Sequence, residues 1–197
     1  MKYTKLKLRE YYLKKRKALS EESHEQLSFA IANQCLNLPI WEFQYFHLFL
    51  PILLKAEFNS TLLLTLLQGR DKDIVIPKMR GEYDLDHILL TDNTIIENNI
   101  WQIPEPKEGI IFDPKQLDVI FIPLLIFDLK GYRVGYGKGF YDRFIRECKS
   151  EVLKIGLSFF DPVETIEDVY QGDVRLNFCV CTTKIYYFMT SVQKKFV

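Results

Sequence analysis

Residues 131–143 read Gly-Tyr-Arg-Val-Gly-Tyr-Gly-Lys-Gly-Phe-Tyr-Asp-Arg, and four of the nine glycines of the chain lie in this segment. Glycine has no Cβ, so it permits tight turns and lets a ligand approach the backbone closely. Successive backbone N–H groups in such a loop can form a concave site for an anion. Arg133 and Lys138 add positive charge at the same place. The segment therefore predicts a site for a polyanion such as a phosphate chain.

The spacing of these glycines differs from two common phosphate-binding motifs. A P-loop requires Gly, four residues and then Gly-Lys-Ser/Thr, whereas Lys138 is followed by Gly139. The dinucleotide motif G-x-G-x-x-G also fails, because Gly135, Gly137 and Gly139 are two residues apart. The glycines alone fit a ligand-free surface turn equally well. The Arg, Lys, Tyr and Asp residues among them favour a nucleotide site.

The rest of the chain predicts helices alternating with strands. Capping residues, apolar periodicity and β-branched runs predict helices over 5–19, 21–38, 60–69 and 140–148, and strands over 45–50, 74–76, 119–122, 152–157 and 178–181. Thr4 and Ser20 are the expected caps of the first two helices, and Leu6, Leu13 and the two adjacent tyrosines are expected to form the apolar face of the first. Residues 92–114 are expected to form an irregular loop. This alternation predicts an α/β fold, a three-layer α/β/α sandwich around a mainly parallel sheet.

The order of these elements also indicates where a ligand binds. The glycine-rich segment follows the predicted strand 119–122 and precedes the helix 140–148. Ligands of open α/β sheets bind outside the carboxyl ends of the strands, and a helix amino terminus favours phosphate. Glu57 follows another strand, so we expect it to face the same crevice.

Composition excludes several classes of protein. The chain has 26 basic and 26 acidic residues, so its formal charge is zero and gives no general attraction to nucleic acid or acidic membranes. No apolar run approaches the roughly 20 residues needed to span a bilayer, and residues 1–16 lack the apolar region of a secretory signal. The four cysteines form no C-x-x-C pair, as expected for thiols in a reducing compartment. We expect one domain over residues 1–197, cytoplasmic, monomeric or weakly dimeric, with small-molecule substrates.

The glycine-rich segment resembles the pattern G-x-R-L-G-x-G-x-G-Y-Y-D of the 5-formyltetrahydrofolate cyclo-ligase family, with Val134 for Leu and Phe140 for the first Tyr. The resemblance extends over nearly the whole chain. Its other matches are Lys5 with Arg9, Glu57, the Trp-Gln-Ile-Pro-Glu-Pro stretch at 101–106, residues 118–128 and 156–159, and Asp173. The glycine-rich segment is highly specific, whereas the outer matches are weak one by one and gain weight from their order.

The resemblance implies an ATP-dependent conversion of 5-formyltetrahydrofolate to 5,10-methenyltetrahydrofolate, ADP and phosphate. It implies Lys138 and Arg133 as catalytic residues and Mg²⁺ held by Asp142 and Asp173. The implied ATP-binding residues are Lys5, Arg9, Arg133, Val134, Gly135, Tyr136, Gly137, Lys138, Gly139, Phe140 and Tyr141. The implied folate-binding residues are Leu50, Glu57, Trp101, Tyr136, Gly137, Lys138, Gly139 and Phe140.

Several of these residues also have ordinary structural explanations. Lys5 and Arg9 lie one helical turn apart and fit a solvated surface. Asp142 fits a helix amino terminus, and Trp101 fits a core position. Asp173 is one of several acidic residues in its region, and the three histidines (His24, His47 and His87) show no metal-ligand spacing.

The chain departs from the family pattern in the loop after the central strand, where Leu124 and Ile126 are bulkier than the usual residues and are expected to narrow the folate crevice. Pro162 and Gly172 also replace polar residues. Two other classes stay open. One is another α/β enzyme, such as a sugar-phosphate isomerase or deaminase, and the other is a non-catalytic nucleotide- or folate-binding protein.

Overall fold

The computed structural model describes residues 3–188 and has an α/β fold built on one eight-stranded sheet. The strands lie in the order β12-β11-β10-β7-β1-β2-β3-β6. The five parallel strands at its centre are β11 (Phe178–Val180), β10 (Leu153–Leu157), β7 (Val119–Pro123), β1 (Tyr45–His47) and β2 (Asp73–Arg80). The antiparallel strands are β12 (Ile185–Tyr187), β3 (Asp84–Leu89) and β6 (Ile110–Ile111). The mainly parallel sheet is confirmed.

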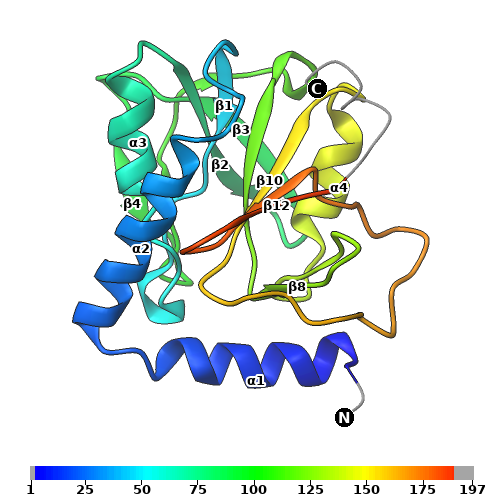
Figure 1. Cartoon of the computed structure of the whole chain (residues 1–197). Helices are drawn as coiled ribbons and strands as arrows, with labels where there is room; N and C mark the ends of the chain where they lie inside the picture. The colour runs from blue at the N-terminus through cyan, green and yellow to red at the C-terminus, as the bar shows by residue number, and fades with distance from the viewer. Residues whose placement is uncertain (1–2, 189–197) are drawn as a thin grey trace.

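Helices cover both faces of this sheet, which confirms the three-layer sandwich (Figure 1). On one face, α2 (Glu21–Cys35) and α3 (Thr61–Gln68) bury apolar side chains such as Ile31 and Leu63 against Phe46 of β1. On the other face, α4 (Phe140–Glu147) buries Phe144 in a second apolar cluster with Ile120 of β7. Successive side chains of a strand point to opposite faces, so β7 contributes Val119 and Phe121 to the first cluster and Ile120 and Ile122 to the second.

Helix α1 (Lys5–Lys17) lies outside these layers and runs along the edge of the sheet at which the parallel strands end (Figure 1). It contacts the short helix η1 (Leu53–Lys55) and the two-stranded hairpin of β8 (Ile126–Phe127) and β9 (Arg133–Val134). Its inward face includes buried Leu8 and Arg16, whereas Leu6 is 60% and Tyr11 54% exposed. The predicted apolar face was wrong at these two positions, because α1 turns cations as well as apolar side chains inward.

The amino ends of the first two helices are held differently. Ser20 caps α2, since its hydroxyl accepts a hydrogen bond from the amide of Ser23 at 3.2 Å. Thr4 occupies the cap position of α1 but makes no side-chain cap bond. Asp168 instead accepts the amide of Lys5 at 2.7 Å, so an acid from far along the chain stabilises the helix amino terminus.

Several predicted boundaries were wrong, since the helix predicted over 21–38 ends at Cys35 and the strand predicted over 45–50 ends at His47. Strand β2 continues through Pro77 to Arg80, pairing with β3; its pairing with β1 ends at Val75, so no donor is needed from Pro77 toward β1. The expected irregular loop 92–114 contains the hairpin of β4 (Ile96–Asn98) and β5 (Pro104–Pro106) and the edge strand β6, before the short helix η2 (Pro114–Gln116). Within residues 3–188, none of the helices combines the length and apolar character needed to cross a bilayer.

Candidate active site

A cavity of about 680 Å³ opens along the edge where the parallel strands end. It is lined by segments that follow β1 and β7, by α1 and by the β4–β5 hairpin. Every residue that the sequence assigned to a site lies on its wall: Lys5, Arg9, Leu50, Glu57, Trp101, Arg133, Val134, Gly135, Tyr136, Gly137, Lys138, Gly139, Phe140, Tyr141, Asp142 and Asp173. The structure therefore brings these residues together, while the role of each stays a prediction.

The entry into the glycine-rich loop is fixed by Asp128. This residue is fully buried, and its carboxylate accepts the amides of Lys130 and Tyr132, each at 2.9 Å, and that of Ile166 at 3.1 Å. A carboxylate that accepts several backbone N–H groups holds a turn in a single conformation. Asp128 thus sets the turn from β8 into β9, and so the direction in which the loop begins.

Two glycines of the loop have conformations that other residues rarely adopt. Gly137 has a φ of +93°, and Gly139, which caps α4, has a φ of +71°. A Cβ on Gly137 would also lie 3.1 Å from Cζ of Arg9. The Arg9 side chain meanwhile donates to the carbonyl of Gly135 at 2.9 Å. Glycine at 137 therefore allows the loop to lie directly against α1.

Among the cations predicted to bind ATP, all but Lys138 are already engaged. Lys5 pairs with Asp173, Arg9 binds the loop backbone, and Arg133 donates to Asp142 at 2.8 Å. Lys138 is exposed, and within residues 3–188 no hydrogen bond or ion pair of its ammonium is present. Lys138 is thus free to meet an incoming anion.

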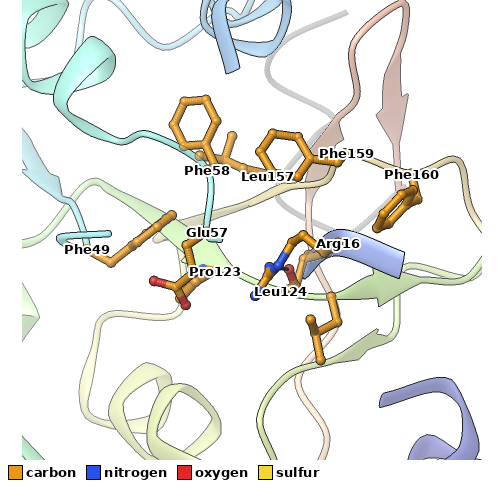
Figure 2. A pocket seen from close by; sticks show the side chains of 10 residues that line it. Arg16, Phe49, Glu57, Phe58, Pro123, Leu124, Leu157, Phe159 and Phe160 are labelled. Carbon is orange, nitrogen blue, oxygen red and sulfur yellow. Dashed lines mark hydrogen bonds between the residues drawn. The ribbon is translucent and has the colours of Figure 1, made fainter. Parts of the chain in front are cut away.

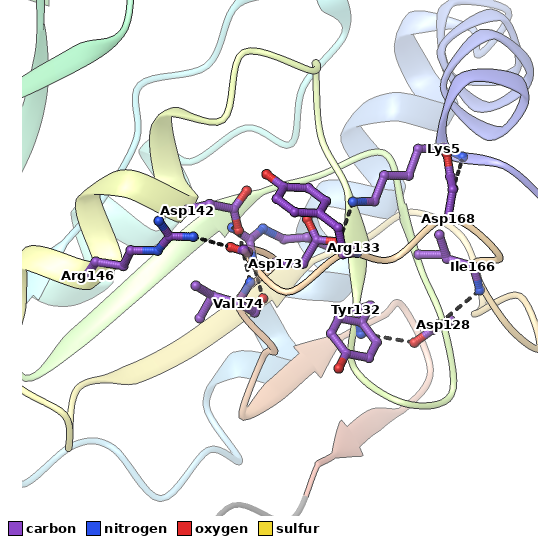
Figure 3. A network of polar contacts seen from close by, with 12 residues as sticks. Lys5, Asp128, Tyr132, Arg133, Asp142, Arg146, Ile166, Asp168, Asp173 and Val174 are labelled. Atoms are coloured by element: carbon purple, nitrogen blue, oxygen red, sulfur yellow. Dashed lines mark hydrogen bonds and ion pairs between the residues drawn. The ribbon is translucent and has the colours of Figure 1, made fainter.

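Asp142 and Asp173 both line the cavity and belong to one network of polar contacts (Figure 3). The amide of Val174 donates to Asp142 at 3.1 Å, and that of Tyr170 donates to Asp173 at 3.0 Å. Among the residues that the structure describes, no group of three or more His, Cys, Asp and Glu side chains is arranged to hold a metal. Mg²⁺ commonly uses one or two carboxylates and takes its other ligands from phosphate and water. The pair therefore fits a metal that arrives with a phosphate chain, but not a metal centre made by the protein alone.

The cavity wall also carries Glu57, which is only 3% exposed. One carboxylate oxygen accepts the amide of Ile52 at 2.7 Å, and the other has no partner within the described chain. Burial raises the pKa of Glu57, while the Tyr136 hydroxyl, the Ile52 amide, Arg16 and Lys55 oppose that rise. An unsatisfied buried acceptor strongly favours a ligand that brings N–H donors.

The β4–β5 hairpin adds an aromatic wall. Trp101 is 54% exposed and lines the cavity, so it is not a core residue. The side chain of Asn99 accepts the amides of Trp101 and Ile103 at 3.0 and 3.1 Å, which fixes the turn that presents the indole. Apolar Met79 and Leu85 line the cavity as well. This wall suits a planar, partly apolar ring system.

The sequence did not indicate two cations near Glu57. Lys55 lies on the cavity wall, with its ammonium 3.9 Å from the centroid of the Tyr136 ring, and burial lowers its pKa. Arg16 is buried directly behind the wall, beside Glu57 (Figure 2). Positions 5, 9 and 16 are four and seven residues apart, so their side chains share one face of α1. That spacing was the available signal.

Two further expectations concern residues near the site. Leu124 and Ile126 are buried in the core, and neither is part of the cavity wall, so the expected narrowing of the crevice by these side chains is not seen. His47 and His87 lie with ring centroids 5.3 Å apart in contact with Phe144 of α4. Burial lowers the pKa of both, that of His87 to about 4, and they pack as neutral aromatic rings.

Comparison with known proteins gives a consistent result. Residues 1–170 match the sequence profile of the 5-formyltetrahydrofolate cyclo-ligase family. A 5-formyltetrahydrofolate cyclo-ligase of Mycoplasma genitalium is 37% identical over 70 residues, which are 35% of this chain and 41% of that one, so the match spans less than half of that relative. The enzyme of the same name from Haemophilus influenzae is 28% identical over 72% of this chain and 76% of its own length.

The fold agrees with this assignment. The solved structure of 5,10-methenyltetrahydrofolate synthetase from Aquifex aeolicus superposes with a TM-score of 0.81 at 29% identity, covering 95% of this chain and 94% of that one. The profile match spans most of the sequence, and the glycine-rich loop that it contains lies at the cavity. The chain therefore belongs to the 5-formyltetrahydrofolate cyclo-ligase family.

Proposed function

We propose that this protein is an ATP-dependent 5-formyltetrahydrofolate cyclo-ligase. The observation that carries the proposal is the division of one cavity between two kinds of wall. Its glycine-rich side supplies backbone donors and cations, and its other side supplies a buried carboxylate and an indole. A reaction between a nucleotide and an aromatic amide-bearing substrate needs both walls in one space. One domain, a cytoplasmic location and a monomer or weak dimer stay predictions.

The glycine-rich wall would hold ATP. Residues 133–141 supply backbone N–H groups, and Lys5 and Arg9 add charge from α1. Phosphoryl transfer depends mainly on positioning and on neutralising the charge of the phosphate oxygens. We assign Lys138 to the transferring phosphate, because its ammonium has no partner within the described residues. We assign Arg133, which pairs with Asp142, to the same phosphate.

Glu57 and Trp101 would hold the folate. The pterin ring carries N–H donors on an amidine-like edge, and an ionised carboxylate matches that edge with charge-assisted hydrogen bonds. The free oxygen of Glu57 is available for this contact. Trp101, about half exposed on the cavity wall, offers a stacking surface, and Leu50, Tyr136 and Phe140 would complete the wall around the substrate.

The proposed reaction has two stages. The formyl oxygen attacks the γ-phosphorus of ATP, the bond to the β–γ bridging oxygen breaks, and ADP leaves. Nitrogen-10 then attacks the activated formyl carbon, the carbon–oxygen bond breaks, and phosphate departs with the proton of nitrogen-10 passing to solvent. The products are 5,10-methenyltetrahydrofolate, ADP and phosphate. No protein nucleophile is required, and the residues of the loop only position and neutralise charge.

Mg²⁺ is part of the proposal as a companion of the nucleotide. Bound through Asp142 and Asp173, it would neutralise charge on the phosphate oxygens. Both carboxylates line the cavity, and each accepts a hydrogen bond from a backbone amide that fixes its orientation. When the metal is bound, Lys5 and Arg133 would be free to turn from these carboxylates to phosphate.

The direct test combines the protein with ATP, MgCl₂ and 5-formyltetrahydrofolate and follows the near-ultraviolet absorbance of the methenyl product. We expect product only when all three are present, and none in excess chelator with metal removal verified. Binding of ATP and folate without product would instead identify a non-catalytic binding protein. Full turnover without metal would contradict the role of Asp142 and Asp173.

A further inference from the structure

Arg16 is the buried cation of the site, although it belongs to the last turn of α1, where Lys14, Lys15 and Lys17 are exposed. It is 3% exposed. Its Nε donates to the carbonyl of Lys55 at 2.9 Å and its Nη1 to that of Leu124 at 3.1 Å, and Nη2 donates to the hydroxyl of Tyr136. A buried guanidinium with all three nitrogens engaged is held in one geometry.

The three acceptors belong to three separate segments. Lys55 is in the loop after β1 that carries Glu57, Leu124 follows β7, and Tyr136 is in the glycine-rich loop. Arg16 itself does not line the large cavity, whereas Lys55, Glu57 and Tyr136 do. It lines a small space of about 10 Å³ behind the wall, where its guanidinium points toward Glu57 and Leu124 (Figure 2). Arg16 thus joins the folate side of the site to the nucleotide side.

Arg16 also belongs to the electrostatic surroundings of Glu57. The charged and titratable groups that face this carboxyl are Arg16 from α1, Lys55 from η1, and Tyr136 and Tyr141 from the glycine-rich segment. On the α2 side, the His24 ring contacts the Glu57 carbonyl at 2.7 Å. Burial favours the neutral acid, while Arg16 and Lys55 favour the carboxylate. Tyr136 lies between Arg16 and Glu57 and interacts with both.

We propose that Arg16 is a positioning residue that fastens the Glu57 loop to the glycine-rich loop and, together with Tyr136, orients Glu57 for the folate beside a fixed positive charge. This inference rests on the proposed function and extends it to a residue that touches neither substrate. Helix α1, whose other basic residues in the last turn are exposed, thereby places a positive charge near the buried carboxylate of Glu57.

The test compares Arg16→Met, which removes the charge, with Arg16→Lys, which retains charge but loses the three-way geometry. Lys14→Met is the matched control, since Lys14 is an exposed cation of the same helix. Each variant is assayed across the range from pH 5 to pH 8 for its folate KM, its ATP KM and its thermal unfolding. We expect Arg16→Met to raise the folate KM roughly tenfold to hundredfold at pH 7 and to move the acid limb of folate binding to higher pH. Arg16→Lys should keep the acid limb near that of the wild type, and Lys14→Met should match the wild type throughout.

Tyr136→Phe separates the direct route from the one through the hydroxyl and also serves if Arg16→Met fails to fold. We expect Tyr136→Phe to raise the folate KM, and its combination with Arg16→Lys to cost less than the product of the two separate losses. If the Arg16 variants lower only the unfolding temperature, with both KM values and the acid limb unchanged, Arg16 is merely structural and the inference is overturned. If the wild type itself neither binds the folate nor forms product, the proposed function falls together with the inference.

Discussion

Replacing Lys138 by alanine tests the nucleotide side of the site most directly. Lys138 is exposed at the tip of the glycine-rich loop, between Gly137 and Gly139, and its ammonium has no partner within residues 3–188. The other loop cation, Arg133, is held by Asp142. The substitution therefore removes a charge that makes no hydrogen bond or ion pair in the described part of the ligand-free protein. Any loss must come from the complex with substrate.

The expected size of the loss follows from this arrangement. An ammonium about 4 Å from a phosphate oxygen, at an effective dielectric constant of about 20, interacts with it by about 4 kcal/mol. Deleting one electrostatic stabiliser of a transition state costs about 2.7–4 kcal/mol, which is roughly a hundredfold to a thousandfold in kcat. Because charge on the transferring group changes during the reaction, the loss should fall on kcat rather than on the ATP KM. The free energy of unfolding should change by less than about 0.5 kcal/mol, as for other surface substitutions.

The assay is steady-state formation of the methenyl product with saturating folate and varied ATP, alongside thermal unfolding. Lys130→Ala is the matched control, because Lys130 is an exposed lysine in the turn between β8 and β9 and lies outside the cavity. We expect normal turnover from Lys130→Ala and a deep fall in kcat from Lys138→Ala at unchanged stability. Normal turnover by Lys138→Ala, or a loss that merely follows unfolding, would refute the reasoning and leave the phosphate to Arg133 and the backbone.

Three other changes test separate features. Glu57→Gln should raise the folate KM by roughly tenfold to hundredfold, because one charged hydrogen bond is lost, and should leave the ATP KM nearly unchanged. Equal losses of affinity for both ligands in parallel titrations would contradict the assignment of Glu57 to the folate pocket. Gly137→Ala should lower the unfolding temperature and weaken ATP binding, because positive φ costs about 1–2 kcal/mol and the new Cβ meets Arg9 at 3.1 Å; unchanged ATP binding by calorimetry would contradict this. His87 has a pKa of about 4 in the folded protein and about 6.5 in the unfolded chain. Between these two pH values, the unfolded chain binds a proton at His87 and the folded protein does not. Stability should then fall as the pH drops from about 6.5 to 4, by up to about 3 kcal/mol from this group, and urea unfolding of His87→Phe should show a smaller fall than the wild type; an equal fall would show that His87 is not responsible.

The sequence allowed the central part of the fold to be predicted because the parallel strands are buried on both faces. Strands such as Val119–Pro123 therefore appear as continuous apolar runs. Such a run can be assigned as a strand from its own residues, without knowing which strands pair with it. Strand β3 was missed, since Asp84–Leu89 mixes two acids with apolar residues and is half-exposed. Its pairing with β2 depends on contacts between strands that no local pattern displays. The same holds for the two-residue strands of the β8–β9 hairpin.

The candidate site was predictable to a different degree on its two sides. The residues of the glycine-rich loop are contiguous in sequence, so their pattern alone predicts a ligand site. The role of Arg16 depends instead on contacts with backbone carbonyls that lie 39 and 108 residues away in sequence. From the sequence it is one of several basic residues at the end of an exposed helix. Burial of a cation at such a position follows only from the way α1 crosses the edge of the sheet.

The position of α1 has a consequence for the order in which the site comes into being during synthesis. Lys5 leaves the ribosome before the residues that it meets, because Asp168 and Asp173 are 163 and 168 positions later. At about 5–20 residues per second, this is a delay of roughly 10–30 s, during which α1 has emerged without the surface on which it lies. A chain interrupted before Asp168 can form most strands of the sheet and still lack the wall that α1 provides. The α1 wall of the binding site can thus be completed only after synthesis has passed Asp173, when most strands of the sheet are already made.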